Sequence, residues 1–257
     1  MRQCDDVVTV APAAVDLPRC YATSVHSFLQ SLTGPVPEGK PRFRGVSHLF
    51  GAGLALLATL AVVGSQLGQA PKKALAVLIF GTSMTLLLTT SATYHCINWK
   101  PGPRAVMRRL DHSAIFLLIA GGWTPLLWLI PSTALGGGPA RLGGYAPLLA
   151  MWAFAVVGVG KSMLWPGAPR WVTAGLCVVM GWMAVGEAIR RAPVVGAVNF
   201  GIIAIAGVTY SLGAVVYAAK RPDPAPAVFG YHEVFHALVL VASAFLFVHV
   251  LGVLAVT

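Results

Sequence analysis

Seven long apolar runs dominate this sequence and limit what it can fold into. They lie at about residues 46–65, 74–95, 111–131, 145–165, 171–188, 199–219 and 232–255. Each is long enough to cross roughly 30 Å of hydrocarbon as an α-helix, and a helix satisfies its own backbone hydrogen bonds, as hydrocarbon requires. A membrane β-barrel would instead show short segments that alternate between polar and apolar residues. The runs therefore predict an all-α integral membrane protein, a seven-transmembrane helix bundle.

Composition and length agree with a single membrane domain. Of the 257 residues, 57% are hydrophobic and only 10% are charged, whereas soluble domains carry about 25% charged residues. We expect residues 1–44 to form an N-terminal tail and residues 45–257 to form the seven-transmembrane domain. Apolar residues at helical spacing between Tyr21 and Leu32 predict either an amphipathic helix on the membrane surface or a solvated segment.

The positive charges predict how the chain is oriented. The net charge is +10, but the Lys and Arg residues sit in the tail and the loops, so we expect no nucleic-acid partner. Most of the 18 fall in the tail and in the second, fourth and sixth loops. Because positively charged loops stay in the cytoplasm, the N-terminus is predicted inside and the C-terminus outside, in a multi-pass protein of the plasma membrane.

Four ionisable residues are predicted to share one depth in the bundle. His95 ends the second run, Asp111 opens the third, and His232 and His236 open the seventh. Successive runs cross in opposite directions, so all four are expected near the inner membrane face. Ionisable residues in membrane helices are costly and usually functional. We therefore predict that they converge on one site.

The three histidines have the spacing of a metal site. His232 and His236 are four residues apart, so their rings project from one helix face, and His95 would add a third imidazole. Three histidines and an open position describe a catalytic Zn²⁺ site, in which the metal lowers the pKa of a bound water toward about 7. The alternatives are interfacial histidines with ordinary hydrogen bonds, or another metal ion that binds imidazole.

Asp111 and Ser91 would supply the remaining chemistry of such a site. Asp111 would bind the metal or deprotonate its water, and the alternative is pairing with Arg108 or His112. Ser91 lies one turn before His95 and would donate to a developing oxyanion. The alternative for Ser91 is a hydrogen bond to its own helix backbone, which is common in membrane helices.

Two other histidines are expected outside the site. His48 lies at the inner start of the first run and could line the same cavity, but an interfacial position is favoured. His249 lies about 20 Å along the helix from His236, at 1.5 Å per residue, which is too far to join the metal ligands.

The seventh run also opens with a sequence that matches a zinc-protease motif. Residues 232–236 read His-Glu-Val-Phe-His, the HExxH pattern of zinc proteases in which the glutamate is the general base. Such proteases need a third ligand, which intramembrane enzymes usually take from a downstream aspartate. No acidic residue follows Glu233. Proteolysis is therefore a minor alternative, and Glu233 is expected to support the ligands or to face the loop.

In combination, four motifs resemble the hemolysin III branch of the progestin and adiponectin receptor family. They read SATYH at 91–95, RLDH at 109–112, GGWTP at 121–125 and HEVFH at 232–236, and the resemblance covers about residues 42–257. It implies a seven-helix fold with the N-terminus inside and zinc in the cytoplasmic half. The family's ligands correspond to His95, His232 and His236, its water-holding aspartate to Asp111 and its serine to Ser91. One departure is Trp123, where bacterial members more often have tyrosine.

The resemblance also implies an activity. The family belongs to a wider group of proposed membrane metal-dependent hydrolases that includes the alkaline ceramidases, and its adiponectin receptors are linked to ceramide amide hydrolysis. We therefore expect a Zn²⁺-dependent hydrolase that acts on an amide or ester bond of a membrane lipid. The alternative is a hemolysin III-type protein with a receptor, membrane-homeostasis or lytic role and a structural zinc.

Overall fold

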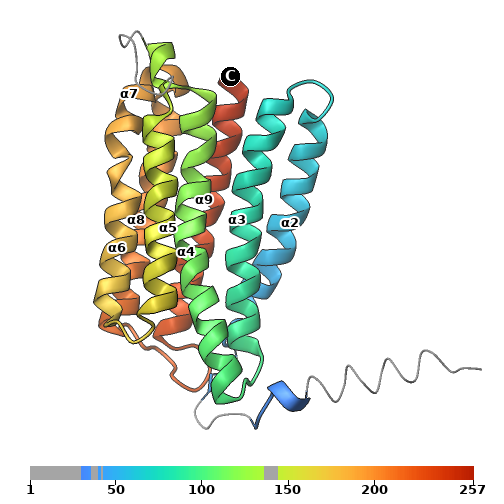
Figure 1. The fold of residues 1–257 in the computed structure, drawn as a ribbon, viewed down its shortest axis with the longest axis vertical. Coiled ribbons are helices and arrows are strands. Elements are labelled where there is room, and N and C mark those ends of the chain that lie inside the picture. The colour runs from blue at the N-terminus through green and yellow to red at the C-terminus, as the bar shows by residue number, and fades with distance from the viewer. Residues whose placement is uncertain (1–29, 36–39, 42, 136–143) are drawn as a thin grey trace, which may run out of the picture.

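The computed structural model describes residues 30–35, 40–41, 43–135 and 144–257. Its main elements are helices that run nearly parallel to one another (Figure 1). They are α2 (Val46–Gln66), α3 (Pro71–Cys96), α4 (Pro101–Leu129), α5 (Ala146–Leu164), α6 (Arg170–Met183), α7 (Val185–Val195), α8 (Ala197–Ala219) and α9 (Tyr231–Val256), with a 3-10 turn η1 (Ser132–Leu135). With α6 and α7 counted as one segment, Arg170–Val195, seven helical segments are long and apolar enough to cross a membrane. The prediction of an all-α bundle with seven spans is confirmed.

Two helix boundaries differ from the prediction. The α4 helix begins at Pro101, ten residues before the predicted third run, because proline is well tolerated in the first helical turn, where its missing N–H costs nothing. The fifth run was predicted to end at residue 188, yet α7 continues to Val195. There Glu187 pairs with Arg190 at 3.5 Å and also with the buried Arg191, so the carboxylate compensates part of the arginine charge on the helix itself.

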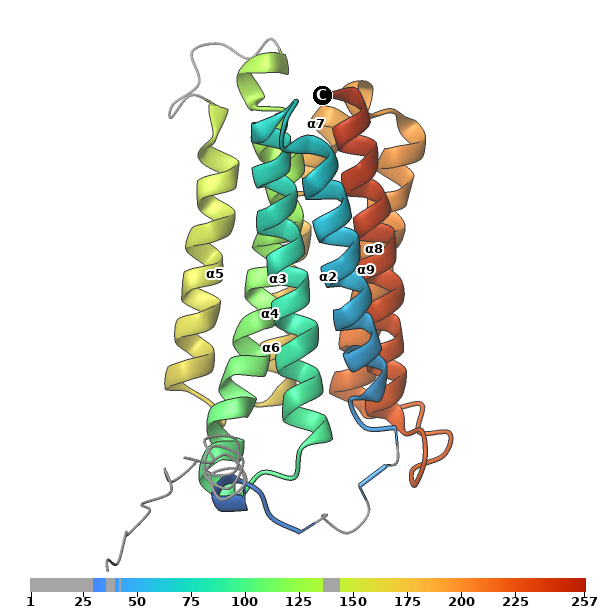
Figure 2. The same ribbon diagram turned by 90° about the vertical axis from the view of Figure 1, so that its right-hand side faces the viewer.

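Helix α9 lies behind α3 and α4 in the view of Figure 1 and beside α2 and α8 in that of Figure 2. It packs closely along α8 and also contacts α2, α3, α4 and α7, while α2, α3, α4 and α5 pack side by side in chain order. Small residues allow these close approaches. A Cβ atom on Gly81 of α3 would lie 2.1 Å from Thr59 Oγ1 of α2, and one on Gly158 of α5 would lie 2.2 Å from the Phe116 ring of α4.

The outer faces of the bundle are apolar, as a lipid solvent requires. Large hydrophobic side chains such as Leu54, Leu57 and Val156 are exposed. His95, His232 and His236 lie at the end where α4, α6 and α9 begin and α3 and α8 end, the histidine end. The chain before α2 contacts this end, because Gly34 N–H donates to Asn98 O and Lys100 N–H donates to Leu32 O.

Three sequence predictions stay predictions. Most of the amphipathic segment between Tyr21 and Leu32 lies outside the described residues. The helix geometry tests neither the inside–outside orientation nor the division of the chain at residue 44.

Candidate metal centre

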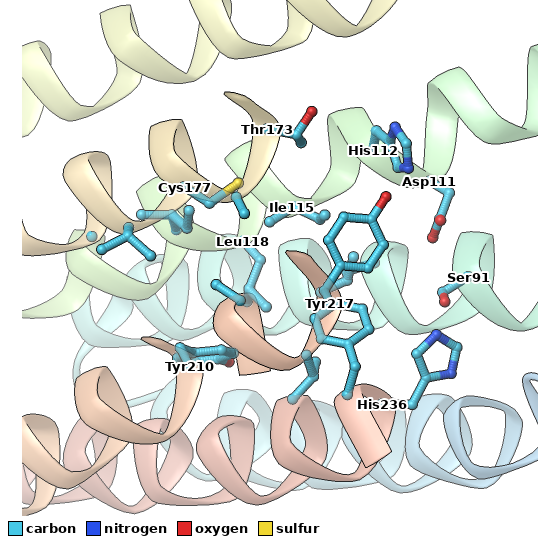
Figure 3. Close-up of a pocket in the computed structure, with 18 of the residues that line it drawn as sticks. Ser91, Asp111, His112, Ile115, Leu118, Thr173, Cys177, Tyr210, Tyr217 and His236 are labelled. Atoms are coloured by element: carbon cyan, nitrogen blue, oxygen red, sulfur yellow. The ribbon is translucent and has the colours of Figure 1, made fainter. Parts of the chain in front are cut away.

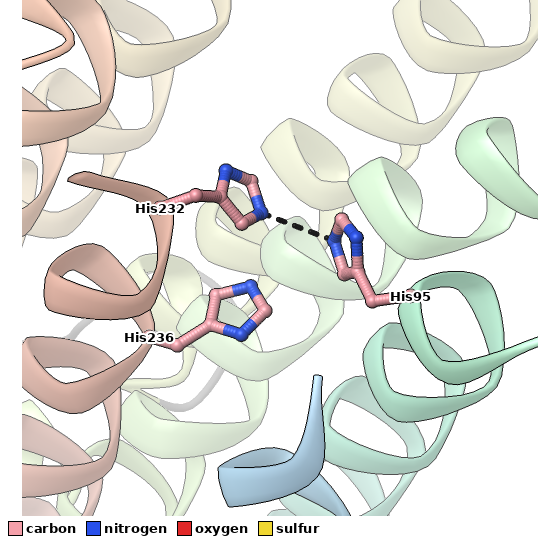
Figure 4. Close-up of side chains that lie close together, drawn as sticks. All are labelled: His95, His232 and His236. Atoms are coloured by element: carbon pink, nitrogen blue, oxygen red, sulfur yellow. Dashed lines mark hydrogen bonds between the residues drawn. The ribbon is translucent and has the colours of Figure 1, made fainter. Parts of the chain in front are cut away.

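His95, His232 and His236 meet at the histidine end of the bundle. His95 lies in the last turn of α3, and the other two lie in the first turns of α9. One ring nitrogen from each lies within 4.8 Å of the others, and His232 Nε2 is 3.1 Å from His95 Nε2 (Figure 4). The predicted convergence of three imidazoles, drawn from positions up to 141 residues apart in the chain, is confirmed.

The surroundings of these rings suit a bound metal ion. His232 and His236 are buried, and His236 Nδ1 has no hydrogen-bond partner among the described residues. A buried nitrogen without a partner is costly, and so is a cluster of imidazoles that all become charged. Neutral histidines are the common protein ligands of Zn²⁺ and related transition metals, so the donor set fits such an ion.

Asp111 and Ser91 lie beside the histidines. Asp111 is buried in the third turn of α4, with its Oδ2 3.8 Å from His95 Nε2. Figure 3 shows its carboxylate facing the hydroxyl of Ser91. Among the described residues Asp111 forms no ion pair with Arg108 or His112, which was the alternative interpretation.

His48 belongs to the same cluster, so its predicted interfacial position is wrong. It is 2% exposed, and its ring stacks on that of His236 with centroids 3.9 Å apart. His48 Nδ1 lies 2.9 Å from Ser91 Oγ, and His48 Nε2 lies 3.4 Å from His236 O. Its place at the inner start of the first run, the same depth as the other four, was the one sequence signal for this role.

Glu233 faces away from the three rings. Its Oε2 accepts a hydrogen bond from Gly230 N–H at 2.8 Å, and its Oε1 lies 2.6 Å from Arg44 Nε. Both carboxylate oxygens are therefore occupied in holding the start of α9. The HExxH pattern reflects this cap, and the arrangement does not place Glu233 as a general base.

His249 is separate from the cluster, as predicted. It is buried in the last third of α9, where its Nδ1 lies 3.0 Å from Asn199 Oδ1 of α8. This contact ties the far ends of the two helices together.

The cluster opens into a large internal cavity of about 660 Å³. The cavity lies between α3, α4, α6, α8 and α9 and is partly shown in Figure 3. At the histidine end its lining is polar and reaches the surface at the exposed Arg104 and Arg170. Beyond the cluster the walls are mainly apolar, with Ile115, Leu118 and Trp123 on α4. A molecule with a polar end and an apolar chain matches this lining.

Sequence comparisons place the chain among known membrane proteins. The profile of the family described as "Haemolysin-III related" matches residues 38–247. The chain is 30% identical to the Hemolysin-3 homolog of Bacillus subtilis (strain 168) over 67% of its own length and 74% of the relative's. It is 29% identical to Hemolysin-3 of Bacillus cereus over 80% of its own length and 88% of the relative's. The chain therefore belongs to the haemolysin-III-related family of multi-pass integral membrane proteins, the hemolysin III branch of the progestin and adiponectin receptor family.

Proposed function

We propose that this protein is a zinc-dependent hydrolase that cleaves an amide or ester bond of a membrane lipid, in the plasma membrane. The observation that carries the proposal is the position of the cluster. Three imidazoles and a buried carboxylate lie where the polar end of the cavity meets its apolar interior. A lipid that entered with its acyl chain inward would present its head-to-chain linkage at this junction.

His95, His232 and His236 would hold the metal. A Zn²⁺ ion bound there would polarise a carbonyl oxygen and make water a better nucleophile near neutral pH. Three protein ligands leave one position free, which is the pattern of catalytic rather than structural zinc sites.

The other polar residues have distinct roles in this proposal. Asp111 accepts a proton from the attacking water and returns it to the departing amine or alcohol. Ser91 donates its hydroxyl hydrogen to the oxygen that gains negative charge. His48, stacked on His236 and within hydrogen-bonding distance of Ser91, fixes the direction of that hydroxyl and is a positioning residue.

Replacement of Asp111 tests the assigned chemistry. Asp111→Asn keeps the size of the side chain but removes its ability to accept a proton. We expect the purified variant to retain its metal, and we expect its rate of lipid hydrolysis to fall about 100-fold or more. Asp223→Asn is the matched control, because Asp223 lies at the same end but outside the cavity lining, where it accepts from Tyr231 N–H. Full activity of Asp111→Asn would refute the role of Asp111.

The names of the two Bacillus relatives favour a lytic role as a second candidate. Hydrolysis and lysis are compatible, because removal of an acyl chain from a membrane lipid disturbs the bilayer. A protein that lyses by forming a pore would not need Asp111. Lysis that survives in Asp111→Asn at the wild-type rate would therefore support a pore and argue against the hydrolase.

A further inference from the structure

Three arginines line the surface end of the cavity without an acidic partner. They are Arg104 and Arg108 on α4 and Arg170 at the start of α6. Within the part of the chain that the structure describes, none of the three forms an ion pair. The described carboxylates at this end have other partners, because Glu233 pairs with Arg44, Asp111 lies beside His95 and Asp223 accepts from Tyr231 N–H.

The partners that these arginines do have leave their charge uncompensated. The Arg104 guanidinium lies over the Tyr94 ring at 5.7 Å. Arg170 lies over the Tyr217 ring at 5.5 Å and donates one N–H to Tyr231 Oη at 2.8 Å. Stacking on an aromatic face orients a guanidinium and leaves most of its five donors free for a planar or tetrahedral anion.

A fourth cation adds to the positive potential of this end. Lys40 also lines the cavity, and its Nζ donates to the neutral acceptors Cys96 O and Asn98 Oδ1. Partial burial lowers the pKa of Lys40 below its ordinary value, and the nearby guanidinium groups of Arg104 and Arg44 act in the same direction. Positive groups at this end are therefore close enough to repel one another, and an anion among them would relieve the repulsion.

Two of the three arginines lie one aromatic ring away from the proposed metal ligands. The Tyr94 ring that contacts Arg104 is 4.5 Å from the His95 ring, and the Tyr217 ring that contacts Arg170 is 6.0 Å from the His232 ring. Along α4 the lining changes from Arg104 to Asp111 over roughly 10 Å of helix. The cavity therefore presents, in order, a cationic end, the histidine cluster and an apolar interior.

The inside-positive bias of membrane proteins accounts for basic residues at this end in general but not for their placement in the cavity wall. Arg109, Lys220 and Arg221 lie at the same end and are absent from the lining. Their positions show that basic residues can satisfy the inside-positive bias without lining the cavity. The charge of the cavity end is thus a separate feature from the charge of the loops.

We propose that the lipid taken by this site carries an anionic headgroup, a phosphate or carboxylate, which Arg104, Arg108 and Arg170 bind while the acyl chain occupies the apolar interior. This inference rests on the proposed hydrolase function for the position of the cleaved bond. A neutral headgroup would leave three cavity arginines without a counter-charge.

A pair of lipids that differ only in the anion tests the inference directly. Binding of a monoacylglycerol and of its phosphate ester, lysophosphatidic acid with the same chain, is measured on the purified protein in neutral detergent. We expect the phosphate ester to bind at least about tenfold more tightly. In Arg104→Gln/Arg108→Gln/Arg170→Gln the preference should fall to about twofold or less, and each single variant should show part of that loss. Lys220→Gln/Arg221→Gln, which removes charge outside the cavity, should keep the full preference.

The outcomes separate this inference from the proposed function. Equal affinity for the two lipids, or an unchanged preference in the three single arginine variants, would overturn the anionic headgroup. Binding of inorganic phosphate as tightly as lysophosphatidic acid would also overturn it, because the acyl chain would then contribute nothing and the arginines would form a site for the free anion. Tight binding of the phosphate ester without any cleavage would leave the headgroup inference standing and would count against the hydrolase alone.

Discussion

At the scale of single residues, His48 links the cluster of three histidines to Ser91. It contacts His236 through its ring face and Ser91 through Nδ1. Residues that hold metal ligands in place are often nearly as important as the ligands. Its depth was the only sequence signal for this role, because its partners come from α3 and α9. The histidine cluster itself was predictable because His232 and His236 are spaced for one helix face and His95 ends a helix at the same depth.

His48→Phe separates the two contacts of this residue. The variant keeps an aromatic ring against His236 but cannot hydrogen-bond to Ser91. We expect the metal content to stay near that of the wild type and lipid hydrolysis to fall about 10- to 100-fold, as measured on purified protein. His249→Phe, a change at another buried histidine, should leave hydrolysis unchanged per folded molecule. Equal activity of His48→Phe and wild type would show that the contact with Ser91 has no role in turnover.

Glu233→Gln distinguishes a helix cap from a protease base. The amide can still accept from Gly230 N–H, but the ion pair with Arg44 is lost. We expect the protein to lose roughly 1–3 kcal/mol of stability, seen as a lower unfolding temperature in detergent, and to keep its hydrolytic activity within a few-fold. A loss of activity by several orders of magnitude with normal stability would restore the protease interpretation of the HExxH motif.

At the scale of helices, apolar length predicted the elements and close packing sets their arrangement. Seven runs gave seven spans because a membrane helix must be long and apolar along its whole length. The start of α4 at Pro101 and the continuation of α7 to Val195 were not predicted. In α4 the proline lies in the first helical turn, where it does not break the helix. In α7 the charge of Glu187 is paired with arginines of the same helix. Helix contacts through glycine depend on the partner helix, which the sequence pattern does not identify.

The contact between α4 and α5 can be tested with two glycines of one helix. Gly158→Ala would place a Cβ atom 2.2 Å from the Phe116 ring, whereas the Gly160 position has no atom within 4 Å. We expect Gly158→Ala to lower stability by about 1–3 kcal/mol and Gly160→Ala to leave it unchanged or slightly raised. Thermal unfolding in detergent measures both. Similar unfolding temperatures for the two variants would contradict the helix packing described here.

At the scale of the whole molecule, orientation decides which compartment the cavity faces. The distribution of basic residues predicts the histidine end in the cytoplasm and Thr257 outside. A cysteine added after Thr257 should react with a membrane-impermeant maleimide in intact cells, and one at Asp223, in the α8–α9 loop, should react only after the membrane is opened. The reverse pattern would place the cavity on the outer face and change the lipid leaflet that supplies its ligand.

The metal content of the purified protein shows whether the three histidines bind a zinc ion. Elemental analysis of the wild type beside His232→Ala/His236→Ala, with His249→Ala as a buried-histidine control, counts the ions bound by the cluster. We expect about one zinc per chain in the wild type and in the control, and none in the double variant. Wild-type protein that carries no transition metal after purification without chelators, and takes up none when zinc is supplied, would contradict the metal centre and the hydrolase built on it.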